Sequence, residues 1–387
     1  MPLGSISALI NSPHRVNECF HSLYADSMQM HSHLDRRSFL GSLGLLFASP
    51  RLRAQRKTSA EPQPDASIAD AARGFLDALR PELRRQASLS FEDPKRKDWS
   101  NLPHFRHPRK GLRLGDLTPS EHAAAHRLLQ AILSSQGYYK ALGIMSVDEF
   151  LGSASDEASK HFGSEYYFLD VFGEPGGGDP WGVQLDGHHL AVNVNVVDHD
   201  VTMTPAHFGA NPVVIPSGRH AGWHVLGGET NKAFALRYAL TPEQARRAVL
   251  AENPPPDIFT SPGRDEALKT PAGISSLQGR QRELLESLVD EYFGNLQPAV
   301  ARAYRNALQS AGFDKVHFAW MGPAEVGKAM YYRIHGPTVL IEYDSIVQPN
   351  TRFPADLEHI HTVMRVPGND FGEDWLRQHH LEHHQKA

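Results

Sequence analysis

The pattern of apolar positions predicts helices over much of the chain. Over residues 67–86 apolar side chains recur three and four positions apart, which is typical of an amphipathic helix. Thr118-Pro119-Ser120-Glu121 has the residue types of a capping box with proline at the first helical position, and it predicts a helix that ends at Gly137. Ser146-Val147-Asp148-Glu149 predicts the start of another helix. Similar patterns predict helices over residues 226–250, 279–293, 298–311 and 370–384.

β-Branched and aromatic residues predict strands in the middle and at the end of the chain. Residues 165–172 have this composition, and Trp181–Leu185 and His188–Val197 flank Asp186-Gly187, a dipeptide typical of a tight hairpin turn. In the second strand of this hairpin, His189, Ala191, Asn193 and Asn195 share one face, and apolar residues share the other. Further strands are predicted over residues 316–321, 330–335, 338–344 and 358–366.

The order of these elements favours an α+β fold. Helices and antiparallel hairpins interleave without a regular β-α-β order, so we expect an antiparallel or mixed sheet with flanking helices. The proline-rich segment 253–273 is expected to be a loop. We therefore expect a single large domain over residues 61–387, preceded by a leader and a polar linker over residues 1–60.

The leader contains a candidate export signal. Arg36-Arg37-Ser38-Phe39-Leu40 and the short, glycine-containing apolar stretch that follows resemble a twin-arginine signal peptide. The alternative is a chance arginine pair before a short core helix. The resemblance implies the twin-arginine export machinery as a partner and a periplasmic or extracellular location. Met28 and Met30 are alternative starts to Met1, and the only cysteine, Cys19, lies in the part that would be removed.

Composition and charge exclude several classes of protein. The chain has 387 residues, of which 40% are hydrophobic, and a net charge of -5, so it can bury a core but has no electrostatic footprint for nucleic acid. Its longest apolar run is too short to cross a bilayer, so we do not expect an integral membrane protein. One cysteine excludes disulfide frameworks and multi-cysteine metal sites. The unusual feature is the 23 histidines, because imidazole is the commonest metal ligand.

Short motifs in a fixed order resemble a known family. They are Gly173-Glu174-Pro175, Pro180-Trp181-Gly182, Gly187-His188-His189-Leu190, Gly209-Ala210-Asn211-Pro212, Tyr331-Tyr332-Arg333-Ile334, Ile341-Glu342-Tyr343-Asp344, His359-Ile360-His361 and Asp370-Phe371-Gly372. Together they resemble the bacterial family named domain of unknown function 3500 over roughly residues 65–385. The resemblance implies one domain in an exported protein and supplies no reaction.

The leading functional hypothesis is a metal site built from separated strands. His359 and His361 are two apart on a predicted strand, so both rings leave the same face, and His189 can supply a third nitrogen. Glu342 is a candidate oxygen ligand or general base, and Asp370 a candidate for orienting a ligand histidine. Zinc or another divalent transition metal held this way can activate water, which suggests a metal-dependent hydrolase or lyase. The alternative is that His-x-His marks a solvated strand face.

A second hypothesis is a non-catalytic extracytoplasmic protein that binds a small polar ligand through Trp181, His188 and Asn193. Gly209–Pro212 is predicted to be a tight turn whose backbone N–H groups can serve as oxyanion donors if it lies beside His189. The stretch His379–His383 has the residue order of an inverted zinc-protease motif, but too few residues follow it for a third ligand, so we expect a solvated helix there.

Overall fold

The computed structural model describes residues 64–383 except 266 and 347–358. The chain divides into two units, Met1–Ser59 and Ala60–Ala387, and all described residues belong to the second. The predicted export signal around Arg36 and Arg37, the candidate starts and Cys19 lie outside the described residues. None of the described helices is both long and apolar enough to cross a lipid bilayer.

The described helices lie mainly in two stretches of the chain, one before the central strands and one after them. They are α2 (Pro64–Ala78), α3 (Pro81–Ala87), α4 (Pro119–Ile132), α5 (Ser135–Gly152), α6 (Gly227–Ala239), α7 (Pro242–Ala248), α8 (Gly279–Phe293), α9 (Pro298–Ala311) and α10 (Glu373–His383). Short 3₁₀ helices occur between them, of which η1 (Pro94–Lys97) and η6 (Asp370–Gly372) lie over the sheet.

Eleven described strands form one mixed sheet. They are β1 (Ser88–Leu89), β2 (Phe168–Phe172), β3 (Trp181–Gly187), β4 (Leu190–Val197), β5 (Asp200–Thr202), β6 (Ala206–Ala210), β7 (Val249–Ala251), β8 (His317–Met321), β9 (Met330–His335), β10 (Leu340–Ile346) and β11 (His359–Arg365). The order across the sheet is β1-β2-β3-β4-β6-β11-β10-β9-β8-β7, with β5 paired to β4. Only the outermost pairs, β1 with β2 and β7 with β8, are parallel. At the centre β6 pairs with β11, which joins the first half of the sheet to the second.

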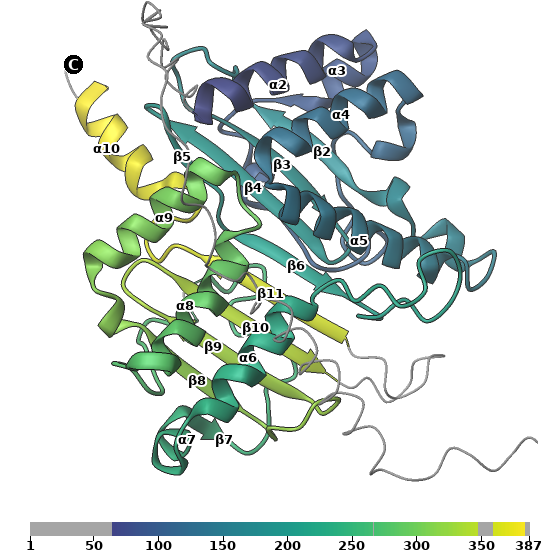
Figure 1. The fold of residues 1–387 in the computed structure, drawn as a ribbon. Helices are drawn as coiled ribbons and strands as arrows, with labels where there is room; N and C mark the ends of the chain where they lie inside the picture. The colour runs from purple at the N-terminus through teal and green to yellow at the C-terminus, as the bar shows by residue number, and fades with distance from the viewer. Residues whose placement is uncertain (1–63, 266, 347–358, 384–387) are drawn as a thin grey trace, which may run out of the picture. The chain divides into compact units, whose positions relative to one another are not determined.

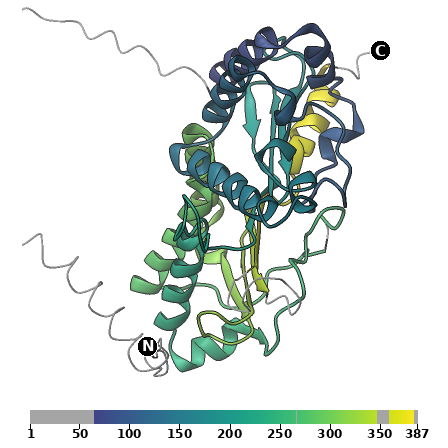
Figure 2. The ribbon, with the colours of Figure 1, turned by 90° about the vertical axis from the view of Figure 1, so that its right-hand side faces the viewer.

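One face of the sheet is apolar and packs against helices. Alternate strand residues such as Val192, Phe208 and Ile360 point to this face and are fully or almost fully buried. Figure 1 shows α2, α4, α5, α6 and α8 in front of the sheet, and Figure 2 shows these helices on one side of it. Their apolar stripes and this sheet face form one continuous hydrophobic core, as expected when helices cover one face of a sheet.

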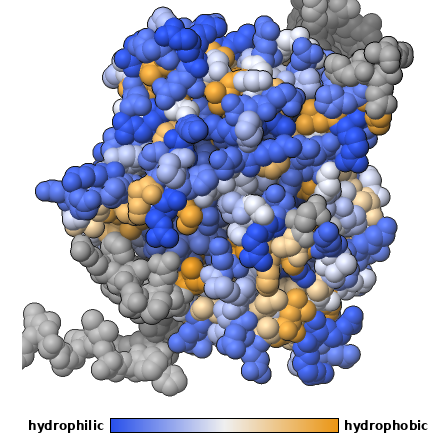
Figure 3. Space-filling model, turned by 180° about the vertical axis from the view of Figure 1, so that it is seen from behind, coloured by the Kyte–Doolittle hydropathy of each residue, from blue (hydrophilic) through white to orange (hydrophobic). Residues whose placement is uncertain are grey.

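The other face is polar and nevertheless buried. It carries charged and amide side chains that irregular segments of the chain cover and pair. Arg109 binds Asp186 at 2.6 Å, Arg96 binds Asn195 at 2.8 Å, and Thr260 donates to Glu342. Figure 3 shows the molecule from this side, where the surface presented to solvent is mainly hydrophilic. A buried polar face is expensive unless its groups are paired, so its unpaired members indicate a function.

The structure confirms the α+β class and most of the predicted elements. Helices α8 and α9 have the predicted bounds, whereas the predicted helix over residues 226–250 is divided into α6 and α7, because a capping box at Thr241 opens α7. The predicted helix from Thr118 to Gly137 was wrong at its end, because α4 ends at Ile132 and Ser134 caps the start of α5. The predicted helix start at Ser146 was also wrong, since this stretch lies inside α5, where Asp148 is buried.

The hairpin turn differs from the prediction in a way that matters for the site. Gly187 pairs with Leu190, so Asp186 and Gly187 belong to β3 and the turn consists of His188 and His189. Asp186 stays in the strand because Arg109 holds its carboxylate on the polar face. The two histidines therefore lie at the tip of the hairpin.

Candidate metal centre

His189 is held in a strained turn conformation. Its φ is +61°, a left-handed value that costs a non-glycine residue about 1 kcal/mol or more. Two backbone hydrogen bonds hold it there: its N–H donates to the carbonyl of Asn101 at 3.1 Å, and its carbonyl accepts from the N–H of Gly209 at 2.7 Å. The second bond ties the hairpin tip to β6 beside the central strand pair. The ring is thereby fixed over the polar face, with 3% of the residue exposed.

His359 and His361 lie on β11 with both rings on the polar face, as the two-residue spacing predicts. Ile360 between them points into the hydrophobic core. In the sheet register His361 lies between Gly209 of β6 and Asp344 of β10. Pairing of β11 with β6 therefore brings these two histidines to the hairpin tip that carries His189.

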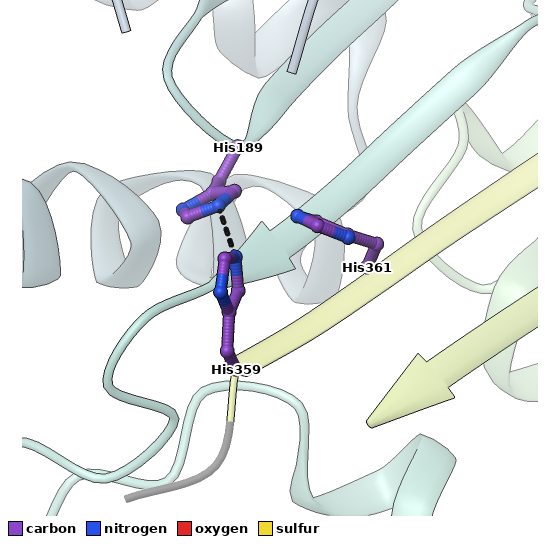
Figure 4. Close-up of side chains that lie close together, drawn as sticks. All are labelled: His189, His359 and His361. Atoms are coloured by element: carbon purple, nitrogen blue, oxygen red, sulfur yellow. Dashed lines mark hydrogen bonds between the residues drawn. The ribbon is translucent and has the colours of Figure 1, made fainter. Parts of the chain in front are cut away.

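The three imidazoles converge on one point (Figure 4). One nitrogen from each of His189, His359 and His361 lies within 4.8 Å of the others, and Nε2 of His189 is 2.8 Å from Nε2 of His359. Two nitrogens bound to one tetrahedral zinc ion at about 2.05 Å lie about 3.3 Å apart. A shift of roughly half an ångström would therefore convert the His189–His359 hydrogen bond into shared coordination.

Two carboxylates face the opposite side of the His361 ring. Nδ1 of His361 lies 3.1 Å from Asp257 Oδ1 and 3.4 Å from Asp344 Oδ1, and its backbone N–H donates to Asp344 at 3.1 Å. Carboxylates on one ring nitrogen orient the other toward a metal and raise its basicity. Asp257, Asp344 and His361 also form a group that satisfies the distance criterion for a metal site, but its histidine is shared with the three-histidine group.

Burial and charge act in opposite directions on these histidines. Burial lowers the pKa values of His189 and His359 well below the ordinary value, and neighbouring histidines lower them further, so both rings are neutral at pH 7. Burial also opposes the charged form of His361, but Asp344 and Asp257 outweigh it and raise its pKa to about 10. A metal ion binding here would therefore replace the proton of His361 and share its two carboxylates.

Sequence reasoning did not identify Asp344 or Asp257 as part of the site, and it considered Gly209 only as a turn residue with a backbone donor. Asp344 could have been found, because it lies two residues after Glu342 and hence on the same strand face. Asp257 comes from the loop between β7 and α8, whose path no local pattern specifies. A Cβ atom at Gly209 would lie 2.7 Å from the carbonyl oxygen of Ile360 and 3.3 Å from the His189 ring, so only glycine fits beneath the histidines.

Glu342 lies on the same sheet face, and its carboxylate binds the covering loop. It accepts hydrogen bonds from the N–H groups of Phe259 and Thr260, from the Thr260 hydroxyl and from the Tyr331 hydroxyl. These four donors saturate both oxygens. Glu342 therefore binds the 253–273 loop to the sheet. Among the described residues, it belongs to neither of the two groups whose side chains lie close enough together to bind one metal ion.

Asp370 does not contact a histidine through any hydrogen bond seen in the described residues. Its carboxylate accepts from Arg365 at 2.7 Å and from the N–H of Val366 at 3.0 Å, so it fixes the end of β11. Asp370 was expected to orient a ligand histidine, but Asp344 and Asp257 are the carboxylates that lie next to His361. The reason is register: Asp344 lies directly across from His361.

The three residues of the binding-protein hypothesis do not form one pocket. Trp181 begins β3 and lies in the hydrophobic core, whereas His188 lies at the opposite end of the hairpin, about 20 Å away at 3.3 Å per residue. Asn193 is buried on the polar face, bonded to Gln184 and to the carbonyl of Pro205. Nδ1 of His188 binds Asp148, and its ring stacks on His189 with centroids 3.9 Å apart.

The prediction of a tight turn over Gly209–Pro212 was wrong at its start, because Gly209 and Ala210 belong to β6, but Gly209 does lie beside His189. However, the Gly209 N–H already donates to the His189 carbonyl, so this donor is not available to a substrate oxyanion. In the C-terminal histidine stretch, His379 binds Asp198 at 2.8 Å. Among the described residues, His379 belongs to neither of the two groups whose side chains lie close enough together to bind one metal ion.

A sequence profile of a protein family described as "Protein of unknown function (DUF3500)" matches residues 61–373. The chain belongs to the DUF3500 family. This match confirms the resemblance and covers β11, Asp257, Asp344 and the hairpin tip, so the whole histidine site lies within the DUF3500 region. No curated protein and no solved structure matches the chain. The DUF3500 description assigns no activity, and function has to be argued from the site.

Proposed function

We propose that this protein is an exported, metal-dependent hydrolase or lyase whose His189, His359 and His361 bind one divalent transition-metal ion, such as zinc. The observation that carries the proposal is the convergence of three buried imidazoles from segments 170 residues apart. Three histidines with one open coordination position are a usual ligand set for a catalytic zinc ion.

Burial weighs against the alternative of a solvated strand face. The three residues are 3%, 8% and 6% exposed, in the order His189, His359 and His361. Nδ1 of His359 has no hydrogen-bond partner among the described residues, and His189 is held at an unfavourable φ. Burying polar rings and straining a turn both cost free energy, which a bound ion would offset.

The charge of the surroundings favours a divalent cation. Asp344 is fully buried, and the side chain of Asp257 is 41% exposed, so two negative charges lie behind His361. Two carboxylates balance an ion of charge +2 held by three neutral imidazoles. A monovalent cation would balance only one of the two carboxylates.

The bound ion would supply Lewis acidity and lower the pKa of a coordinated water molecule. The chain's own contribution is positional. The hairpin strain holds His189, the strand register holds His359 and His361, and the carboxylates keep Nε2 of His361 directed at the ion. The irregular segments over the polar face limit the access of bulk water.

Elemental analysis tests the metal proposal directly. Protein purified without an affinity tag should contain about one equivalent of metal, and the His359→Ala/His361→Ala double variant should lose it. The matched control is His122→Ala/His126→Ala, which removes two histidines that stack on α4 with ring centroids 5.9 Å apart. Loss of metal in the control to the same extent, or no metal in the wild type, would contradict the proposal.

The export part of the proposal rests on the sequence of the leader. Replacing Arg36 and Arg37 by lysine preserves charge but removes the paired guanidinium groups that characterise a twin-arginine signal. Cell fractionation should then find the protein retained in the cytoplasm, whereas the wild type is found outside it. Equal export of both forms would refute this route.

A further inference from the structure

Four histidines, not three, surround Gly209 on the polar face. His361 lies across the β6–β11 ladder from Gly209, and His189 lies on the side of β4. His359 and His207 lie one pleat away in opposite directions along the strands, His359 on β11 and His207 on β6. The rings of His207 and His189 close over Gly209, since a Cβ atom there would lie 3.2 Å from His207 Nε2 and 3.3 Å from His189 Cδ2.

His207 is the most deeply buried of the four, and neither of its ring nitrogens is satisfied. The residue is 0% exposed, and neither Nδ1 nor Nε2 has a hydrogen-bond partner among the described residues. One side of the ring packs against Trp99, with ring centroids 5.4 Å apart, and the other faces His361 at 5.8 Å. Leaving two polar atoms buried without partners is costly, so a bound group at this point would be stabilising.

His207 stays outside the group of nitrogens that can share one ion. Of the four histidines around Gly209, only His189, His359 and His361 have nitrogens close enough together to bind one ion. An ion bound by these three nitrogens would keep one coordination position open. His207 lies on the side of Gly209 that the other three histidines leave uncovered. His207 is the fourth histidine around Gly209, and its ring faces that of His361 with centroids 5.8 Å apart.

Resting on the proposed function, we propose that His207 is a substrate-binding residue that holds the oxygen ligand of the metal ion, and that this ligand belongs to the class of small carboxylates. An imidazole offers one N–H donor and one acceptor nitrogen. A carboxylate can place one oxygen on the ion and accept a hydrogen bond from His207 with the other. The neighbouring apolar residues Trp99, Ala191 and Val363 limit the ligand to a small one on this side.

Cobalt-substituted protein provides the test, with acetate as the probe. Acetate should change the visible absorption of the Co²⁺ ion, and titration gives its dissociation constant. His207→Phe keeps an aromatic ring against Trp99 but removes both nitrogens. It should retain one equivalent of cobalt and bind acetate roughly ten- to hundredfold more weakly, which is the effect of losing one hydrogen bond to a charged group.

Two further variants make the result specific. His207→Gln retains a donor and an acceptor and should restore part of the affinity, also serving if the phenylalanine variant fails to fold. His335→Phe is the matched control, because His335 is another buried histidine on the polar face, on β9 outside the cluster, and should leave acetate binding unchanged.

The outcomes separate this inference from the proposed function. Full cobalt content with wild-type acetate affinity in both His207 variants overturns the role of His207 alone. Loss of cobalt from His207→Phe also overturns it, because His207 would then be a ligand of the ion. Absence of stoichiometric cobalt from the wild type overturns the metal centre and the inference together.

Discussion

Asp344→Asn removes one charge from the proposed metal centre with little change in shape. Asp344 is fully buried opposite His361, and its Oδ1 atom accepts from the His361 backbone while facing His361 Nδ1 at 3.4 Å. The amide of asparagine can keep the backbone hydrogen bond but not the negative charge. We therefore expect the variant to fold and to bind the divalent ion more weakly.

The size of the effect follows from the distance between the carboxylate and the ion. The 3.4 Å contact, the width of the ring and a metal–nitrogen bond of about 2 Å place the charge about 7 Å from the ion. At an effective dielectric constant of about 20, a charge of -1 and an ion of +2 at this distance attract by about 5 kcal/mol. Part of this loss is offset, because the buried carboxylate of Asp344 has a desolvation cost that the neutral amide of asparagine does not have. Variants of carboxylates behind metal-bound histidines lose about 10- to 100-fold in affinity, or about 1.4–2.7 kcal/mol, which is the range expected here.

A competition titration against a chromophoric zinc chelator measures this loss. Asp370→Asn is the matched control, because Asp370 also lies on the polar side of the sheet but binds Arg365 and Val366. It should keep the wild-type zinc affinity within about twofold. Equal zinc affinity in Asp344→Asn and the wild type would refute the role of Asp344, and a larger loss in Asp370→Asn would restore the role expected from the sequence.

Three further predictions concern stability and the shape of the site. Burial, together with nearby Arg333 and His317, lowers the pKa of His335 to about 4. Between pH 6.5 and 4 the unfolded chain therefore binds more protons than the folded chain, and the unfolding free energy falls as the pH falls. The unfolding free energy from urea titrations should therefore drop about 2 kcal/mol more between pH 7.5 and 5.0 in the wild type than in His335→Phe, and an equal drop would contradict this. Glu342→Ala leaves buried donors without an acceptor and should lower the unfolding free energy by about 3 kcal/mol while metal content stays at the wild-type level; loss of metal without loss of stability would instead make Glu342 a ligand. Gly209→Ala forces a methyl group against the Ile360 carbonyl and the His189 ring and should reduce zinc affinity at least tenfold; unchanged affinity by the same chelator assay would show that the space over Gly209 is not needed.

Much of the fold could be predicted because local patterns are strong in this chain. The capping box at Thr241 and the alternation in β4 specify helix and strand without tertiary information. Helix α4 was misjudged because its end depends on packing. Ser134 caps α5 and donates to the Gly294 carbonyl, and Asn295 lies against Gly137, and these are contacts with residues about 160 positions away.

The histidines of the site, and the strand face that carries Asp344, could be identified, but which residues lie next to the histidines in space could not. His-x-His is visible in the sequence because strands repeat every two residues. The pairing of β11 with β6 and β10 is non-local, so the sequence does not show that Asp344 faces His361 or that Gly209 lies beneath the rings. The hairpin turn was placed two residues early because Asp-Gly usually forms a turn, while here Arg109 retains Asp186 in the sheet.

A metal ion bound as proposed would have a mechanical role at the seam between β6 and β11. Its ligands would be a hairpin tip near residue 189 and a strand near residue 360, so one bound ion would close a loop of about 170 residues between the two halves of the sheet. The chain's only cysteine is Cys19, so no disulfide can fasten this seam. By the chain-entropy relation for cross-links, closing a loop of this length restricts the unfolded chain by about 5 kcal/mol. The ion would thus act as a reversible cross-link, and removing it with a chelator would weaken the contact between β6 and β11.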